Sequence, residues 1–230
     1  MIAFMFNIKT KRILNIIILC VVLIHSTCIT PELSSAGKIA YSRWNGSANV
    51  IYIMNVDGSG KTAITDGTYN DFEPVYSPDG SKIVFARNFG PGDQQILIMN
   101  ADGRGIKQLT FSGNCGDPTF RHDGRKILYK KENGFFVMDI DGSNKQEIPF
   151  VKGSQANWHP SFSPDGSKIV FLSLRVNPQK IYIMNADGTG LKRLTNNAGR
   201  EGYATFSPDG TKMVFSIGPY AGINEIYMVN

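Results

Sequence analysis

The chain has 230 residues, with 24 lysines and arginines against 19 aspartates and glutamates, and a formal net charge of +5 at pH 7. Setting aside Lys9, Lys11 and Arg12 at the N-terminus leaves 21 basic residues against the 19 acidic ones, a charge of +2. No run of basic residues and no aromatic platform follows, so the composition argues against a nucleic-acid partner.

The first 28 residues have the pattern of a secretory signal peptide. A basic start is followed by the largely apolar stretch from Ile13 to Ile24, which is too short to cross a bilayer core of about 30 Å as a helix with ordinary margins. Two ways of processing stay open. One is cleavage after the small residues 34–36, which would remove the first predicted strand. The other is lipidation at Cys28, because residues 23–28 resemble a lipobox, although His25 and Thr27 depart from that pattern.

Residues 29–230 contain two interleaved repeats. The first is a Ser-Pro-Asp-Gly turn followed by Lys-Ile-Val-Phe, and its aspartates are 44, 42 and 44 residues apart. In chain order these aspartates are Asp79, Asp123, Asp165 and Asp209. A period of about 40–45 residues with several short strands in each unit is typical of a β-propeller blade.

Each repeat unit predicts four antiparallel strands. In Ser-Pro-Asp-Gly, proline presets φ and glycine takes the left-handed position, which gives a type I turn with a bulge between the first two strands. The second repeat, Ile-Tyr-Ile-Met-Asn-Ala-Asp-Gly, predicts the third strand and its turn. The fourth strand is short and ends in Leu-Thr, as in residues 107–110 and 192–195. Short, partly charged strands suit the outer edge of a blade.

The repeats at the two ends decide the number of blades. Pro31 to Tyr41 aligns with Pro74 to Phe85 after one deletion, so we interpret it as a worn first strand. Every innermost strand is then present, and only the last blade lacks its outer strand. The prediction is an all-β, five-bladed propeller whose last blade is three-stranded. The alternative is a truncated six-bladed ring, which would need about 43 more residues at this period.

These paired motifs resemble the TolB-type, WD-like propeller repeat family over about residues 31–230. TolB proteins are similar to this chain in the propeller alone, because they carry an α/β domain in front of it and six blades, and residues 24–31 leave no room for that domain. The resemblance therefore implies no contacts made through that domain. It does imply an envelope protein as partner, with a Pal-like lipoprotein as the specific expectation.

Catalytic and metal signatures are missing from the sequence. His122 stands at the proline position of a turn, so we interpret it as a substituted turn residue. For His159, a packed side chain is a simpler interpretation than a side chain that contacts a ligand. The repeated aspartates sit singly in tight turns and lack the spaced oxygen ligands of a calcium loop. We expect a protein that is not an enzyme and needs no cofactor or metal, with calcium left open.

Binding residues are expected where the repeats differ. The loops between the second and third strands, and those between blades, vary and share one end of each blade, and variable loops on a rigid scaffold usually carry binding. Their arginines and aromatic residues are of the types that dominate protein interfaces. The predicted partner-binding residues are Arg43, Trp44, Tyr69, Asp71, Arg87, Phe89, Trp158, His159, Arg175, Arg200, Glu201, Tyr203 and Tyr220.

The resulting hypothesis is an exported, monomeric binding protein of the periplasm, or one anchored in the cell envelope by lipid. It would meet a membrane only through its signal or a lipid anchor. A carbohydrate-binding propeller and an accessory module of an exported hydrolase are the alternatives. Pairing of the open edge of blade five with a second chain also stays open.

Overall fold

The computed structural model describes residues 32–33, 37–149, 156–218 and 225–229, and their regular structure is entirely β-strand. These residues form two compact units that divide between residues 147 and 148. We call them the N-terminal unit and the C-terminal unit and describe each by itself. The predicted signal peptide, Cys28 and Tyr220 lie outside the described residues.

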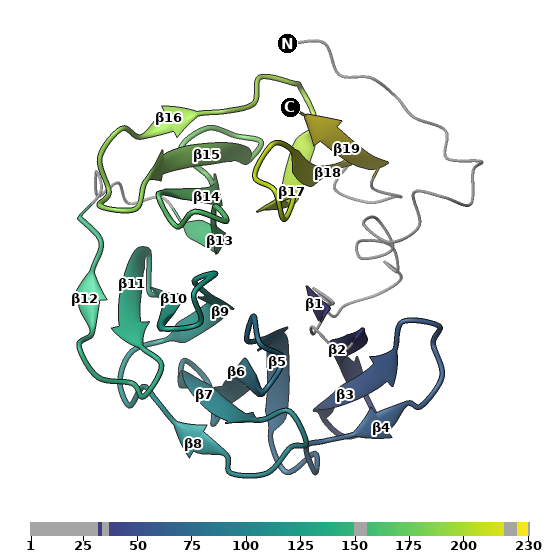
Figure 1. Ribbon diagram of the computed structural model, residues 1–230. Coiled ribbons are helices and arrows are strands. Elements are labelled where there is room, and N and C mark those ends of the chain that lie inside the picture. The colour runs from purple at the N-terminus through teal and green to yellow at the C-terminus, as the bar shows by residue number, and fades with distance from the viewer. Residues whose placement is uncertain (1–31, 34–36, 150–155, 219–224, 230) are drawn as a thin grey trace. The chain divides into compact units, whose positions relative to one another are not determined.

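The N-terminal unit contains three antiparallel sheets of four strands each, coloured purple to teal in Figure 1. Blade 1 has β1 (Glu32–Leu33), β2 (Lys38–Trp44), β3 (Asn49–Asn55) and β4 (Thr62–Ala63). Blade 2 has β5 (Asn70–Tyr76), β6 (Lys82–Asn88), β7 (Gln94–Asn100) and β8 (Lys107–Gln108). Blade 3 has β9 (Cys115–Phe120), β10 (Lys126–Lys131), β11 (Gly134–Asp139) and β12 (Gln146–Glu147).

The C-terminal unit contains two further sheets, coloured green to yellow in Figure 1. Blade 4 has β13 (Asn157–Phe162), β14 (Lys168–Ser173), β15 (Lys180–Asn185) and β16 (Lys192–Arg193). Blade 5 has the three strands β17 (Arg200–Phe206), β18 (Met213–Gly218) and β19 (Glu225–Val229).

The predicted fold class is confirmed, because the described residues form the five blade sheets of a β-propeller and the fifth has three strands. The worn first strand is confirmed as well. Glu32 pairs with Ala40 and Leu33 with Ile39, so β1 is the first strand of blade 1. The outer strands are shorter than the sequence suggested, since each ends before its Leu-Thr or equivalent pair.

The Ser-Pro-Asp-Gly segments form the predicted turns. In blade 2 the amide of Gly80 donates to the carbonyl of Ser77 (2.8 Å), and Gly80 has a φ of 72°. The Asp79 carboxylate accepts hydrogen bonds from the Ser77 hydroxyl (2.5 Å) and from the amide of Ser81 (3.0 Å). The same contacts recur at Asp165 and Asp209. These aspartates are occupied within their own turns.

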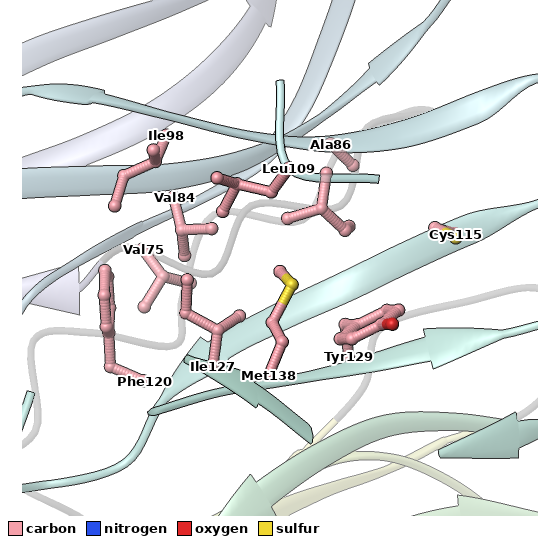
Figure 2. Packing of buried hydrophobic residues seen from close by; sticks show 11 residues of the cluster. Val75, Val84, Ala86, Ile98, Leu109, Cys115, Phe120, Ile127, Tyr129 and Met138 are labelled. Carbon is pink, nitrogen blue, oxygen red and sulfur yellow. The ribbon is translucent and has the colours of Figure 1, made fainter. Parts of the chain in front are cut away.

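Apolar side chains pack between neighbouring blades. Figure 2 shows the cluster between blades 2 and 3, where Val84 of β6 and Ile127 of β10 are fully buried beside Met138 of β11. A similar cluster joins blades 1 and 2 around Ile51 and Phe85, and another joins blades 4 and 5 around Val170 and Phe215. Because both faces of a blade are covered, its central strands can be apolar at consecutive positions.

A turn glycine lets neighbouring blades approach closely. Gly103, in the turn after β7, has a φ of 87°, and a Cβ atom there would lie 2.6 Å from the backbone oxygen of Ile64 at the end of blade 1. Gly58 has the same place in blade 1, with a φ of 82°, but a Cβ atom there would meet nothing within 4 Å. Glycine is therefore required at position 103 both by its backbone conformation and by the space available.

Candidate functional site

The innermost strands of blades 2 to 5 each contain a β-bulge where the strand pairs with its neighbour. At each bulge one residue that is not glycine has a positive φ. In chain order these are Glu73 (54°), Asp117 (51°), His159 (51°) and Tyr203 (23°). A left-handed residue other than glycine costs about 1–3 kcal/mol and persists only where the surrounding structure holds it. Bulges of this kind re-aim side chains and are common next to binding sites.

Within each unit the bulge residues of adjacent blades contact one another. In the N-terminal unit the Glu73 carboxylate accepts a hydrogen bond from the amide of Asp117 (2.6 Å). In the C-terminal unit the rings of His159 and Tyr203 lie 4.0 Å apart between centroids. Burial raises the pKa of Tyr203 to about 12, so its hydroxyl stays protonated at neutral pH. His159 is thus packed against its neighbour, as the sequence favoured.

A buried ion pair lies at the loop end of blade 2. The Arg87 guanidinium donates to both carboxylate oxygens of Asp71, at 2.7 and 2.9 Å, and also lies 5.0 Å from the ring centre of Tyr69. Asp71 is fully buried and Arg87 is 9% exposed. Burial raises the pKa of Asp71 above its usual value, although the bonds from Arg87 oppose that rise. The two charged groups therefore bond each other inside the protein.

A threonine after the outer strand connects consecutive blades. Thr65 accepts a hydrogen bond from the amide of Ile51 in β3 (3.0 Å) and bonds the Asp71 carboxylate of blade 2. In the C-terminal unit Thr195 repeats this arrangement, because it accepts from the amide of Ile181 (3.3 Å) and donates to Glu201 of blade 5. Glu201 is 1% exposed. Asp71 and Glu201, both predicted to bind a partner, therefore occupy equivalent structural positions between blades.

An exposed aromatic group lies at the loop ends of blades 1 to 3. Trp44 is 53% exposed, Tyr69 39%, Phe89 36% and Phe111 75%. The rings of Tyr69 and Phe89 meet edge to face at 5.0 Å. These four residues, which we call the aromatic patch, are among the six large hydrophobic residues that are exposed in the described part of the chain. Scattered exposed apolar side chains are ordinary, but all four of these lie at the loop ends of their blades and two of them are in contact.

The remaining predicted residues differ in accessibility. Arg43 and Arg200 are exposed at strand ends, whereas Trp158 is half-buried and packs against the core between blades 4 and 5. Arg175 donates to Asn157 and Ser173, both at 3.2 Å, and its guanidinium lies over Tyr182. Burial lowers the pKa of Arg175. In the C-terminal unit only Arg200 among the predicted residues is both described and exposed.

Sequence reasoning missed Phe111 and a polar hollow. Phe111 directly follows the Leu-Thr pair of blade 2, and an aromatic residue just past an outer strand was the available signal. The hollow, of about 340 Å³, lies between the loop ends of blades 2 and 3, and its lining residues are Phe72, Glu73, Asn88, Gly90, Gly92, Gln94 and Asn114. A second hollow of about 290 Å³ lies beside Tyr69 and Arg87.

Two features are absent from the part of the chain that the structure describes. There is no group of three or more His, Cys, Asp or Glu side chains that could hold a metal ion. No helix in the same residues is long and apolar enough to cross a membrane.

Comparison with known proteins gives a consistent family. The family model described as the TolB beta propeller domain matches residues 18–156 and 131–230. The chain is 32% identical over 146 residues to a protein TolB homolog of Chlorobium luteolum, covering 62% of this chain and 33% of the relative. It is 26% identical over 175 residues to the Tol-Pal system protein TolB of Francisella tularensis subsp. mediasiatica, covering 73% of this chain and 40% of that relative.

The fold also matches solved structures. The structure of a putative TolB from Agrobacterium tumefaciens has a TM-score of 0.74 and 20% sequence identity, covering 88% of this chain and 76% of that one. Identity at this level is evidence of a shared fold alone. The chain spans between a third and two fifths of the length of the two curated relatives.

Proposed function

Because the chain belongs to the TolB beta propeller domain family, we propose that it is an exported, non-catalytic protein of the cell envelope that binds a protein partner through the loop ends of its blades. The aromatic patch is the observation that supports this role most directly. Its exposed rings are of the type that anchors protein interfaces, and they lie at or next to the loop ends of the blade strands.

The binding surface is narrower than the set predicted from sequence. In the N-terminal unit we assign direct contact to Trp44, Tyr69, Phe89 and Phe111, with exposed Arg43 at the rim. Asp71 and Arg87 act indirectly, because they form a buried ion pair and the Arg87 guanidinium lies 5.0 Å from the ring centre of Tyr69. An aromatic centre with a charged rim is the usual anatomy of a protein interface.

The partner that we propose is a Pal-like lipoprotein. The Francisella relative is named as a Tol-Pal system protein, and the match to it covers 73% of this chain. Export through the signal peptide predicted at residues 1–28 would bring the chain to the compartment of such a lipoprotein, whether Cys28 is lipidated or not. We expect the chain itself to be monomeric, and light scattering that gives a dimer would contradict this.

The test is capture of the partner from envelope extract with the full chain, carrying a C-terminal tag, as bait. The loop variant combines Trp44→Ala, Phe89→Ala and Phe111→Ala. The matched control is Val56→Ala with Lys61→Ala, two exposed residues at the opposite, turn end of blade 1. We expect the wild type and the control to recover a Pal-like lipoprotein and the loop variant to lose it.

The affinity of the purified lipoprotein for each variant is then measured by calorimetry. Removing three anchors should weaken binding at least a hundredfold, since each hot-spot side chain contributes about 2 kcal/mol or more. Equal affinity for the loop variant and the control would show that the loop ends are not the binding surface. Recovery of no lipoprotein by the wild type would reject the proposed partner.

A further inference from the structure

The hollow between blades 2 and 3 has a lining that the protein-binding role does not use. Glu73 and Phe72 come from the bulged strand β5, Asn88 and Gln94 from the facing ends of β6 and β7, and Asn114 from the loop before β9. All of these elements belong to the N-terminal unit. A volume of about 340 Å³ lies at the lower end of the range of small-molecule sites, which is about 300–1,000 Å³.

The amides that line the hollow keep much of their bonding capacity. Asn88 uses its Oδ1 to accept from the amide of Gly90 (2.8 Å), which leaves its NH₂ group as a donor. Within the described residues, no hydrogen bond uses the side-chain amides of Gln94 and Asn114. A side-chain amide offers both an acceptor oxygen and two donor hydrogens. The lining therefore presents donors and acceptors side by side.

The bulge residue Glu73 lines the hollow, and Gly116 lies next to two of the lining side chains. Glu73 has a left-handed φ of 54°, and its Oε2 accepts a hydrogen bond from the amide of Asp117. A Cβ atom at Gly116 would lie 3.1 Å from Oε1 of Gln94 and 3.6 Å from Oε2 of Glu73. Because position 116 is glycine, neither oxygen meets a Cβ atom there. The backbone strain at Glu73 is thus associated with a specific arrangement of polar atoms.

The charge of the lining limits the class of ligand. Glu73 is the only charged residue that lines the hollow in the described chain, so an anionic ligand such as a phosphate or a uronate is disfavoured by repulsion. Vicinal hydroxyl groups suit the lining well, because each hydroxyl both donates and accepts, as each amide does. Phe72 adds an apolar surface for the C–H face of a ring.

We propose that this hollow is a binding subsite for one neutral saccharide unit, held by Glu73, Asn88, Gln94 and Asn114. The subsite goes beyond the proposed protein-binding function, and it lies beside the aromatic patch because Phe89 directly follows Asn88. A glycan of the envelope would then contact the same end of the blades as the protein partner.

The test uses the full chain and three sugars as probes, with binding followed by saturation-transfer NMR and titration. Methyl glucoside and N-acetylglucosamine are the neutral probes, and galacturonate is the anionic one. We expect both neutral sugars to receive saturation from the wild-type protein and to bind at least tenfold more tightly than galacturonate. Absence of saturation transfer to both neutral sugars, or preference for galacturonate, would overturn the proposal.

Matched variants locate the site. Gln94→Ala removes an amide from the hollow. Gly116→Ala adds a methyl group 3.1 Å from Oε1 of Gln94 and 3.6 Å from Oε2 of Glu73, at a position whose backbone is not left-handed. Gln146→Ala removes an exposed amide from the outer strand β12 and serves as the control. We expect each hollow variant to weaken sugar binding at least fivefold and the control to leave it unchanged. Equal binding by all three variants would place the sugar elsewhere and overturn the proposal.

Removing the charge of Glu73 provides a second readout, which a change in folding would not produce. Glu73→Gln keeps an acceptor for the amide of Asp117 but removes the negative charge, so galacturonate should bind this variant at least fivefold more tightly than it binds the wild type. An unchanged galacturonate affinity would overturn the role of Glu73. Protein capture by the aromatic patch is measured separately, so failure of one proposal leaves the other distinguishable.

Discussion

The two ends of each blade use the same strands in different ways. At the turn end, the same aspartate, serine and glycine contacts recur in blades 2, 4 and 5, and the aspartates bond within their own turns. At the loop end, blade 2 has a buried ion pair beneath two exposed rings, while blade 5 has a buried glutamate bonded to a threonine. Residues that recur from blade to blade therefore stabilise the backbone of their own turn. Residues that differ between blades have roles that depend on contacts with the neighbouring blade.

The largest expected effect comes from disrupting the buried ion pair of Asp71 and Arg87 at the loop end of blade 2. Arg87→Ala leaves the fully buried Asp71 carboxylate without its cation, which should lower the free energy of unfolding by about 3–5 kcal/mol. The exposed Arg43→Ala should change it by less than about 0.5 kcal/mol. Urea denaturation measures both. Combining Asp71→Asn with Arg87→Met should recover part of the loss, and a double variant as unstable as Arg87→Ala would contradict the charge argument.

The next effect compares two turn glycines that differ only in their surroundings. Gly58→Ala should cost about 1 kcal/mol for its positive φ. Gly103→Ala adds overlap with the Ile64 backbone, so it should cost about 2–4 kcal/mol. Thermal unfolding of both variants isolates the contact between blades 1 and 2. Equal losses would mean that the blades separate to accept the methyl group.

A smaller effect tests the connecting threonine. Thr195→Val removes the hydroxyl that donates to the buried Glu201, which should cost about 1–3 kcal/mol. Thr62→Val, in the exposed outer strand β4, should cost less than about 0.5 kcal/mol. Denaturant midpoints of the two variants provide the measurement. Similar midpoints would show that Thr195 does not connect blades 4 and 5 energetically.

The smallest effect belongs to the turn end and depends on pH. Hydrogen bonds from serine hydroxyls hold the pKa of Asp79, Asp165 and Asp209 at about 2, below the value of about 3.9 in an unfolded chain. Their contribution to stability is therefore present above about pH 4 and is lost as the pH falls towards about 2. The contribution is small because these groups are exposed.

Acid unfolding of a triple Asp→Asn variant checks this pH dependence. Its stability should vary less between pH 4 and pH 2 than that of the wild type, and an identical acid profile would contradict the lowered pKa values. This variant separates the turn end from the loop end, because it changes the turn aspartates and leaves the loop-end pair of Asp71 and Arg87 unchanged.

Much of the fold could be predicted because its signals are local. The turn of Ser77 to Gly80 needs only proline, aspartate and glycine in order, and the apolar run of β7 predicts a strand covered on both faces. The accessibility of the candidate site residues was less predictable. Trp44, Tyr69 and Phe89, which are exposed, were among the predicted binding residues and the exposed Phe111 was not, and no sequence pattern distinguished buried Asp71 and Glu201 from exposed residues of the same loops.

The sequence by itself determined the four-stranded blade and its turns, because both follow from contacts within one repeat unit. The repeat and the family were recognisable from the recurring motifs themselves. Tertiary structure alone decided which charged side chains are buried, where the left-handed bulges fall and which amides face a common hollow. The physical reason is that Asp71 meets Thr65, Glu73 meets Asp117 and His159 meets Tyr203 across blade boundaries. The residues of the last two pairs are each 44 positions apart, so no local pattern encodes their contact.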